Sequence, residues 1–288
     1  MQILESMFFG KFFFEVALVL RSSLLLSSLL LNSEAWVNLS DNNIRGLEQT
    51  DEILLSKILD CDGNSSNVFK YLELGVYPIR FEIMKRKTIF LQYILQQEKN
   101  SMMYKVFQAT CESPVKNDFV KTCSKYLDIL DIKLSFDEIS QMSQNKFKQI
   151  VKQKTEEAAF KYLIKEKNKQ SKISHLKYSS LKMQEYLLEG NKNTHISRLI
   201  FKARGRNLDI KTHKQWKYDD DLCVGCGKNV ESEEELLTCE SFSANNETIS
   251  DNYSYNCFFE DSVTKMVIVA KIIDKRIKTR KKILEDPG

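Results

Sequence analysis

The sequence predicts a mainly α-helical protein, and composition gives three reasons. Only 9 glycines and 3 prolines are spread over 288 residues, so few residues break regular structure. Leu, Lys, Glu, Gln and Met, which favour helices, are frequent. The 42% of hydrophobic residues is enough for a sizeable core. We therefore expect a helical bundle with further helical segments and little strand.

The first predicted helix is the apolar stretch from Phe12 to Leu31. A stretch of this length is typical of either a membrane span or a buried core helix. Glu15 and Arg21 interrupt it, and charges in lipid are costly. We favour a buried helix and retain, as an alternative, a membrane-anchored protein with this stretch as its span.

Periodicity and capping residues predict the helices that follow. Apolar residues recur at helical spacing over Leu47–Leu59, with Ser40 and Asp41 before them as cap candidates. Gly75 and Pro78 then predict a sharp corner between two helices.

Later segments are predicted in the same way. Ser135, followed three residues later by Glu138, is typical of a capping box that opens a helix. The Lys-, Asn- and Ser-rich stretch 165–177 predicts a mobile linker or an unpaired nucleic-acid contact rather than part of a core. The segment 266–284 predicts a basic amphipathic helix, which suits surface docking, membrane association or nucleic-acid binding.

Positive charge is concentrated between Asn145 and Lys217. That segment holds 19 Lys and Arg against 6 acids, although the whole chain carries only +4. Such an excess favours an acidic partner, and RNA or DNA is the commonest one. The simpler alternative is a set of solvated helix faces.

A cysteine motif predicts a metal site. Cys223 and Cys226 form a CxxC turn, and Cys239 follows, so three thiolates can converge on one metal. Glu235 is a candidate fourth ligand, and Cys257 or His213 can replace it only if the fold brings them close. Zinc is the metal that this ligand set predicts, and the alternative is a set of reduced cysteines that hold no metal.

No complete catalytic site is expected. Tyr218-Asp219-Asp220-Asp221 is similar to the acidic motif of a polymerase palm, but it is flanked by Lys217 and the CxxC turn instead of apolar strands. We interpret it as a solvated acidic turn. The three histidines stand apart from any nucleophile, so a hydrolase and a small-molecule substrate are disfavoured.

Arginines and lysines near the CxxC motif are candidate phosphate contacts. They surround Arg204-Gly205-Arg206 and have the aromatic residues Trp216 and Tyr218 nearby, a mixture that suits phosphates and unpaired bases. The complete predicted set is Lys85, Arg86, Arg198, Lys202, Arg204 and Arg206.

The order of the motifs resembles a known family. The motifs that carry the resemblance are Asn32-Ser33-Glu34-Ala35-Trp36, Gly46-Leu47-Glu48 with Asp51, Tyr71-Leu72-Glu73-Leu74-Gly75, Pro78-Ile79-Arg80, Lys85-Arg86-Lys87, Ser171-Lys172, Gln184-Glu185-Tyr186-Leu187, Phe201-Lys202-Ala203-Arg204, and the CxxC with Leu236-Leu237-Thr238-Cys239. In this order they are similar to the region downstream of the palm in non-long-terminal-repeat (non-LTR) retrotransposon reverse transcriptases. One departure is that Glu235 stands where that family commonly has His.

The resemblance implies a nucleic-acid-binding chain without the catalytic palm, such as a truncated copy. It implies a thumb-like helical module at 1–100, a basic helical connector at 101–215, a cysteine knuckle at 216–242 and a basic helical tail at 243–288. We expect RNA or DNA as partner, no polymerase active site, and an intracellular location, cytoplasmic or nuclear. A helical scaffold that binds another protein is a further alternative.

Overall fold

The computed structural model describes residues 12–37, 39–63, 65–112, 119–189, 193–242, 253–260 and 262–285. The start of the predicted thumb-like module (1–11) and of the predicted tail (243–252) lie outside the described residues. The described chain is helical and contains no β-sheet, so the predicted fold class is confirmed.

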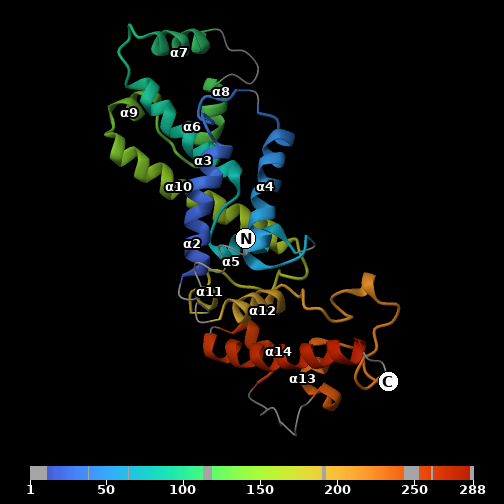
Figure 1. The fold of residues 1–288 in the computed structure, drawn as a ribbon. Helices are drawn as coiled ribbons and strands as arrows, with labels where there is room; N and C mark the ends of the chain where they lie inside the picture. The colour runs from blue at the N-terminus through green and yellow to red at the C-terminus, as the bar shows by residue number, and fades with distance from the viewer. Residues whose placement is uncertain are drawn as a thin grey trace.

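The α-helices are α2 (Phe13–Leu20), α3 (Leu26–Leu29), α4 (Asp41–Leu59), α5 (Asn67–Leu74), α6 (Ile79–Leu95), α7 (Met102–Glu112), α8 (Phe119–Ile129), α9 (Phe136–Gln141), α10 (Gln144–Asn168), α11 (Glu185–Glu189), α12 (Thr194–Arg204), α13 (Glu233–Thr238) and α14 (Val263–Glu285). Shorter helical turns are η1 (Arg21–Leu25), η3 (Gln215–Lys217), η4 (Glu240–Phe242) and η5 (Tyr255–Phe259). The molecule is elongated, with α7, α8 and α9 at one end and α13 and α14 at the other (Figure 1).

Local signals place several helix ends where the sequence predicts them. Ser40 caps α4 by accepting a hydrogen bond from the backbone N–H of Asn43, and Ser135 and Glu138 form the predicted capping box of α9. Gly75 ends α5 with a φ of 66°, which favours glycine. Pro78 then precedes α6, so the predicted corner is confirmed.

Three apolar clusters stabilise the molecule. The main cluster contains buried residues of α2, α4, α5, α11, α12, α13 and α14. A second cluster joins α6, α7, α8, α9 and α10, and a small third one joins α3 and α6. The main cluster draws residues from all four predicted segments, from Phe13 to Ile273. The predicted boundaries therefore do not divide this core, and the domain division itself stays a prediction.

The apolar N-terminal stretch is a bent helix packed on the protein. The π-helical turn η1 lies between α2 and α3, and the side chain of Arg21 in this turn is buried. Arg21 donates two hydrogen bonds to the carboxylate of Asp51, at 2.6 and 2.7 Å. None of the described helices is both long enough and apolar enough to cross a membrane.

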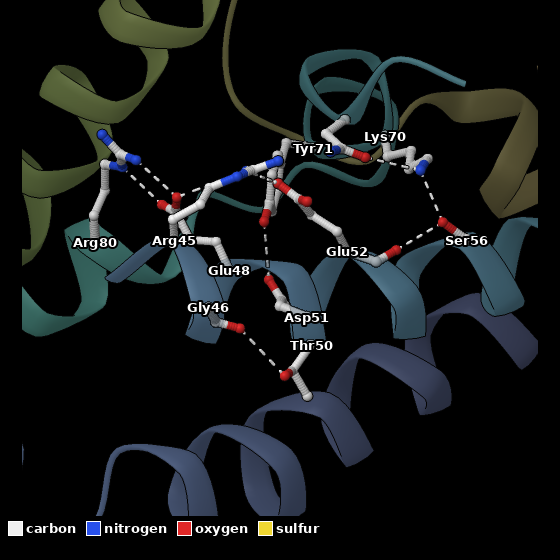
Figure 2. A network of polar contacts seen from close by, with 11 residues as sticks. Arg45, Gly46, Glu48, Thr50, Asp51, Glu52, Ser56, Lys70, Tyr71 and Arg80 are labelled. Atoms are coloured by element: carbon white, nitrogen blue, oxygen red, sulfur yellow. Dashed lines mark hydrogen bonds and ion pairs between the residues drawn. The ribbon is translucent and has the colours of Figure 1, made fainter. Parts of the chain in front are cut away.

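Buried charges fix α4 against its neighbours (Figure 2). Glu48 accepts two hydrogen bonds of 2.7 Å from Arg80 of α6. Asp51, besides its pair with Arg21, accepts a hydrogen bond from the hydroxyl of Tyr71. Breaking one partner of such a pair leaves an uncompensated buried charge, which makes these contacts selective for this arrangement of helices.

The prediction of a mobile linker at 165–177 was wrong. Helix α10 continues to Asn168, and the following turn places Ile173 and Leu176 in the main cluster. The ammonium group of Lys167 is buried and donates to the carbonyl oxygens of Ser174 and Leu176, at 2.7 Å each. The polar composition of this stretch gave no sign that Ile173 and Leu176 are buried, or that Lys167 donates hydrogen bonds to backbone carbonyls.

Candidate metal centre and basic surfaces

The CxxC turn is shaped by backbone hydrogen bonds. The N–H of Cys223 donates to the carbonyl of Asn229, and the N–H of Gly227 donates to the carbonyl of Cys223. Gly227 has a φ of 64°, in the left-handed region that glycine occupies readily. The turn therefore brings Cys223 and Cys226 to the same side.

Helix α13 supplies the other two side chains. Ser232 caps this helix, Glu235 lies in its first turn, and Cys239 follows its last residue. Ligand atoms of Cys223, Cys226, Glu235 and Cys239 all lie within 4.8 Å of one another. The predicted convergence of these four residues, called here the cysteine centre, is confirmed as a group that could hold a metal ion.

Distances in the cysteine centre fit a tetrahedral ion. The sulfur atoms of Cys223 and Cys239 are 3.7 Å apart, and a carboxylate oxygen of Glu235 lies 3.2 Å from the sulfur of Cys226. Thiolates bound to zinc at about 2.3 Å in a tetrahedron are about 3.8 Å from each other. The separation of the Cys223 and Cys239 sulfur atoms therefore matches two ligands of such an ion.

The electrostatics of the four ligands differ. Burial raises the pKa of the Cys223 thiol to about 12. Backbone N–H groups of Asn229 and Lys228 lower the pKa of Cys226. Burial opposes ionisation of Glu235, but a hydrogen bond from the Asn229 side chain leaves the pKa of this carboxyl below its usual range. A bound cation would favour the thiolate form of Cys223.

The alternative fourth ligands are engaged elsewhere. The ring of His213 accepts a hydrogen bond from the backbone N–H of Leu208, and its other nitrogen lies 2.8 Å from a carboxylate oxygen of Glu233. Cys257 is buried in the main cluster. In the described part of the chain, the group that could hold a metal ion includes neither His213 nor Cys257.

Charged residues that were not predicted from the sequence form hydrogen bonds with the segments around the cysteine centre. Glu231 is fully buried and accepts hydrogen bonds from Arg280 at 2.5 Å and from the N–H of Val224 at 3.2 Å. Arg276 donates to the carbonyl oxygens of Leu236 and Cys239, at 3.1 and 2.9 Å. The i, i+4 spacing of the two arginines was the available signal. Both arginines lie on the buried face of α14.

The acidic turn is exposed, in line with its interpretation as solvated. Asp219, Asp220 and Asp221 are exposed, and Asp220 pairs with Lys211 at 2.5 Å.

Most of the predicted phosphate contacts already have partners in the protein. Lys85 and Arg86 pair with Glu82, at 2.5 and 3.3 Å. Lys202 pairs with Asp60 at 2.9 Å. Arg198 lies over the ring of Phe13 and donates to a backbone carbonyl oxygen of α4. Lys85 and Arg86 lie on α6, whereas Arg198 and Lys202 lie on α12.

Arg204 and Arg206 are only two positions apart but lie in opposite environments. Arg204 is buried, donates to Glu73 at 3.2 and 3.3 Å and to the carbonyl of Phe258 at 2.5 Å. A phosphate contact would require breaking these bonds, so its role in this structure is internal. Arg206 keeps a side chain 48% exposed and lies 3.9 Å from Glu233.

Exposed lysines gather instead on α14 and α10. On α14 they recur every three or four residues, which places them on one outward face, called here the lysine face. It consists of Lys271, Lys275, Lys278 and Lys282, of which Lys278 pairs with Asp274 of the same helix at 2.7 Å. On α10 the exposed lysines are Lys146, Lys148, Lys152, Lys161 and Lys165.

The opposite face of α14 is buried. Met266, Val269, Ala270 and Ile273 belong to the main cluster, and the helix packs on α11, α12 and α13. The amphipathic pattern predicted from the sequence is confirmed for this face. Because it is covered by protein, it is not free to enter a lipid surface.

Comparisons with known proteins identify no relative of this chain. No family model, curated protein or solved structure matches it. What the structure itself offers is a group of four ligands that could hold a metal ion, and two helices with exposed lysines.

Proposed function

We propose that this chain binds nucleic acid and that the lysine face of α14 contacts the phosphates. The observation that carries this proposal is the alignment of Lys271, Lys275, Lys278 and Lys282 on one outward face of a helix whose other face is buried. Such ammonium groups neutralise phosphates and release their counterions. The helix holds six lysines and two arginines against Asp274 and Glu285.

The cysteine centre is proposed to hold structural zinc. Three thiolates and the carboxylate of Glu235 would fill the four tetrahedral positions and leave none for a reacting water, as in closed structural sites. Zinc would supply a cross-link between the CxxC turn and the end of α13. Because Arg276 joins α13 to α14 through two backbone carbonyls, this link would also steady the lysine face.

The same reading relates the chain to the thumb and cysteine-knuckle region of non-LTR retrotransposon reverse transcriptases. The order of the motifs supports this relation. The role proposed from it is binding of RNA or DNA rather than synthesis.

The test is a salt series of binding to single-stranded RNA and to duplex DNA. In duplex DNA each neutralised phosphate contributes about 0.9 to the slope of log K against log salt. Replacing the four lysines of the lysine face by Gln should therefore flatten the slope for duplex DNA by about 3.6. A matched variant replaces Lys146, Lys152, Lys161 and Lys165 of α10 by Gln and removes the same charge.

The two variants separate a specific surface from net charge. A larger loss of slope in the α14 variant supports the proposal. Equal losses in both variants would mean that charge alone drives binding. Absence of binding by the wild-type protein at low salt would refute the proposed function.

A further inference from the structure

A cavity whose lining contains none of the four residues of the cysteine centre lies where α5 begins and where α10 and α12 end. Its volume is about 440 Å³. The lining comes from the start of α5, the turn after α10 and the end of α12, and consists of Ser65, Ser66, Phe69, Lys169, Gln170, Ser171, Lys172, Ile173, Phe201, Gly205, Arg206 and Asn207. Three of these described residues are cations and none is an acid.

The cations around the cavity carry a surplus of positive charge. Lys172 is exposed and forms no ion pair with the described residues. Among the described residues, the ion-pair partner of Arg206 is Glu233, at the long distance of 3.9 Å. Lys169 is paired with Glu166 at 2.6 Å. The local charge is therefore positive after these pairs are taken into account.

The position of Arg206 at the rim is set by tight packing. A Cβ atom on Gly205 would lie 2.6 Å from the ring of Phe69, so only glycine lets the chain pass so close to this ring. Arg206 follows with a φ of 50°, an unfavourable conformation for a residue other than glycine. Phe69 itself stacks on Phe201 with ring centroids 4.6 Å apart, and these two rings form an apolar part of the cavity lining.

Polar side chains complete the lining. The amide of Asn207 donates to the hydroxyl of Ser65 and accepts a hydrogen bond from Lys214, so its orientation is fixed. Phosphates and sugars in protein complexes are contacted by side chains of these kinds, namely Arg, Lys, Ser and Asn. A water molecule takes about 30 Å³ in the liquid, so a cavity of about 440 Å³ has room for many waters. A sugar with its phosphate therefore fits inside it.

We propose that this cavity binds a backbone phosphate of nucleic acid together with its sugar, a site separate from the lysine face that rests on the proposed function. Lys172 and Arg206 are the charged contacts to the phosphate. The hydroxyls of Ser65 and Ser66 and the amide of Asn207 line the space for the sugar.

The experiment measures binding of a short single-stranded RNA, labelled for fluorescence anisotropy, at fixed salt. The Lys172→Glu/Arg206→Glu variant should bind about tenfold more weakly or worse, because two phosphate contacts become repulsive. The Lys146→Glu/Lys152→Glu variant is the matched control, since both lysines are exposed on α10 and outside the lining. The Lys172→Arg/Arg206→Lys variant, which keeps both charges, should retain most of the affinity.

Each possible result of this experiment either supports or refutes the proposed cavity site. A loss confined to the cavity variant supports the site, whereas equal losses in the cavity and control variants overturn it. A second arm titrates orthophosphate into the wild type and the cavity variant. If the cavity substitutions abolish orthophosphate binding but leave RNA binding unchanged, the site takes a free anion and the nucleic-acid assignment is wrong. RNA binding that is absent even from the wild type refutes the proposed function as a whole.

Discussion

The carboxylate of Glu73 accepts hydrogen bonds from the hydroxyls of Tyr178 and Tyr186, at 2.5 Å each, and pairs with Arg204. All the groups are buried or nearly so, and burial together with Glu73 raises the pKa of both tyrosines well above the usual value. The tyrosines therefore remain neutral donors. The network joins α5 to α12, to α11 and to the segment before α11.

Replacing Glu73 by Gln should destabilise the protein strongly. The change leaves the guanidinium of Arg204 buried without its carboxylate, and loss of one partner in such a pair costs about 3–5 kcal/mol. Urea denaturation of the wild type and of Glu73→Gln measures the loss. The Glu73→Gln/Arg204→Met double variant should lose less than the two single variants together, and strictly additive losses would contradict the pair.

Sequence patterns could not assign Arg204 correctly, because its partner lies 131 residues away. In the sequence it stands beside Arg206 in a basic stretch, and charge density alone makes the two alike. Only the packing of the folded chain distinguishes the buried Arg204 from the exposed Arg206. The same holds for Glu231 and Arg280, which are 49 residues apart and both fully buried.

Helix α14 connects the proposed zinc site at the cysteine centre with the proposed nucleic-acid contacts of the lysine face. Its inner face carries apolar residues and Arg276 and Arg280, which bond to the segments around the cysteine centre. Its outer face carries the lysines. A cross-link within the cysteine centre would therefore restrain the helix that displays the lysine face.

Removal of metal should lower the melting temperature. With a chelator, or with Cys226→Ser, we expect a decrease of about 5 °C or more, because a structural ion contributes to folding free energy. Differential scanning calorimetry measures the shift. The control is Cys111→Ser, an exposed cysteine outside the metal-ligating group. If the chelator shifts neither the wild type nor any variant, the cysteine centre carries no structural metal.

Local signals in the sequence fix the ends of elements but not their partners. The caps at Ser40 and Ser135, the corner at Gly75 and the CxxC turn all depend on residues within one or two turns of chain, so they could be predicted. The segment 165–177 could not, because its polar composition gives no sign that Ile173 and Leu176 reach a core formed by other helices.

At the scale of the molecule, one apolar cluster reaches from α2 to α14. The residues come from both ends of the described chain, and Phe258 of η5 is fully buried among them. A second cluster around α6 and α8 includes Phe147 of α10. The ends of the chain are therefore expected to unfold together with α5 and α12.

Replacing Phe258 by Ala should loosen the whole region built on the main cluster. Truncating a buried Phe costs about 3–5 kcal/mol through lost burial and the cavity left behind. Hydrogen exchange should become faster in α5 and α12 as well as around residue 258. Phe147→Ala, in the second cluster, is the comparison variant. Faster exchange limited to residues 253–285 would show that this end folds independently of the rest.

The most direct test of the account is nucleic-acid affinity with and without metal. Single-stranded RNA binding is measured by anisotropy for zinc-loaded protein, for chelated protein and after zinc is added back. If the cysteine centre holds zinc and steadies the lysine face, chelation weakens binding by about tenfold and zinc restores it. An affinity that is the same in all three states would contradict the link between the metal centre and nucleic-acid binding.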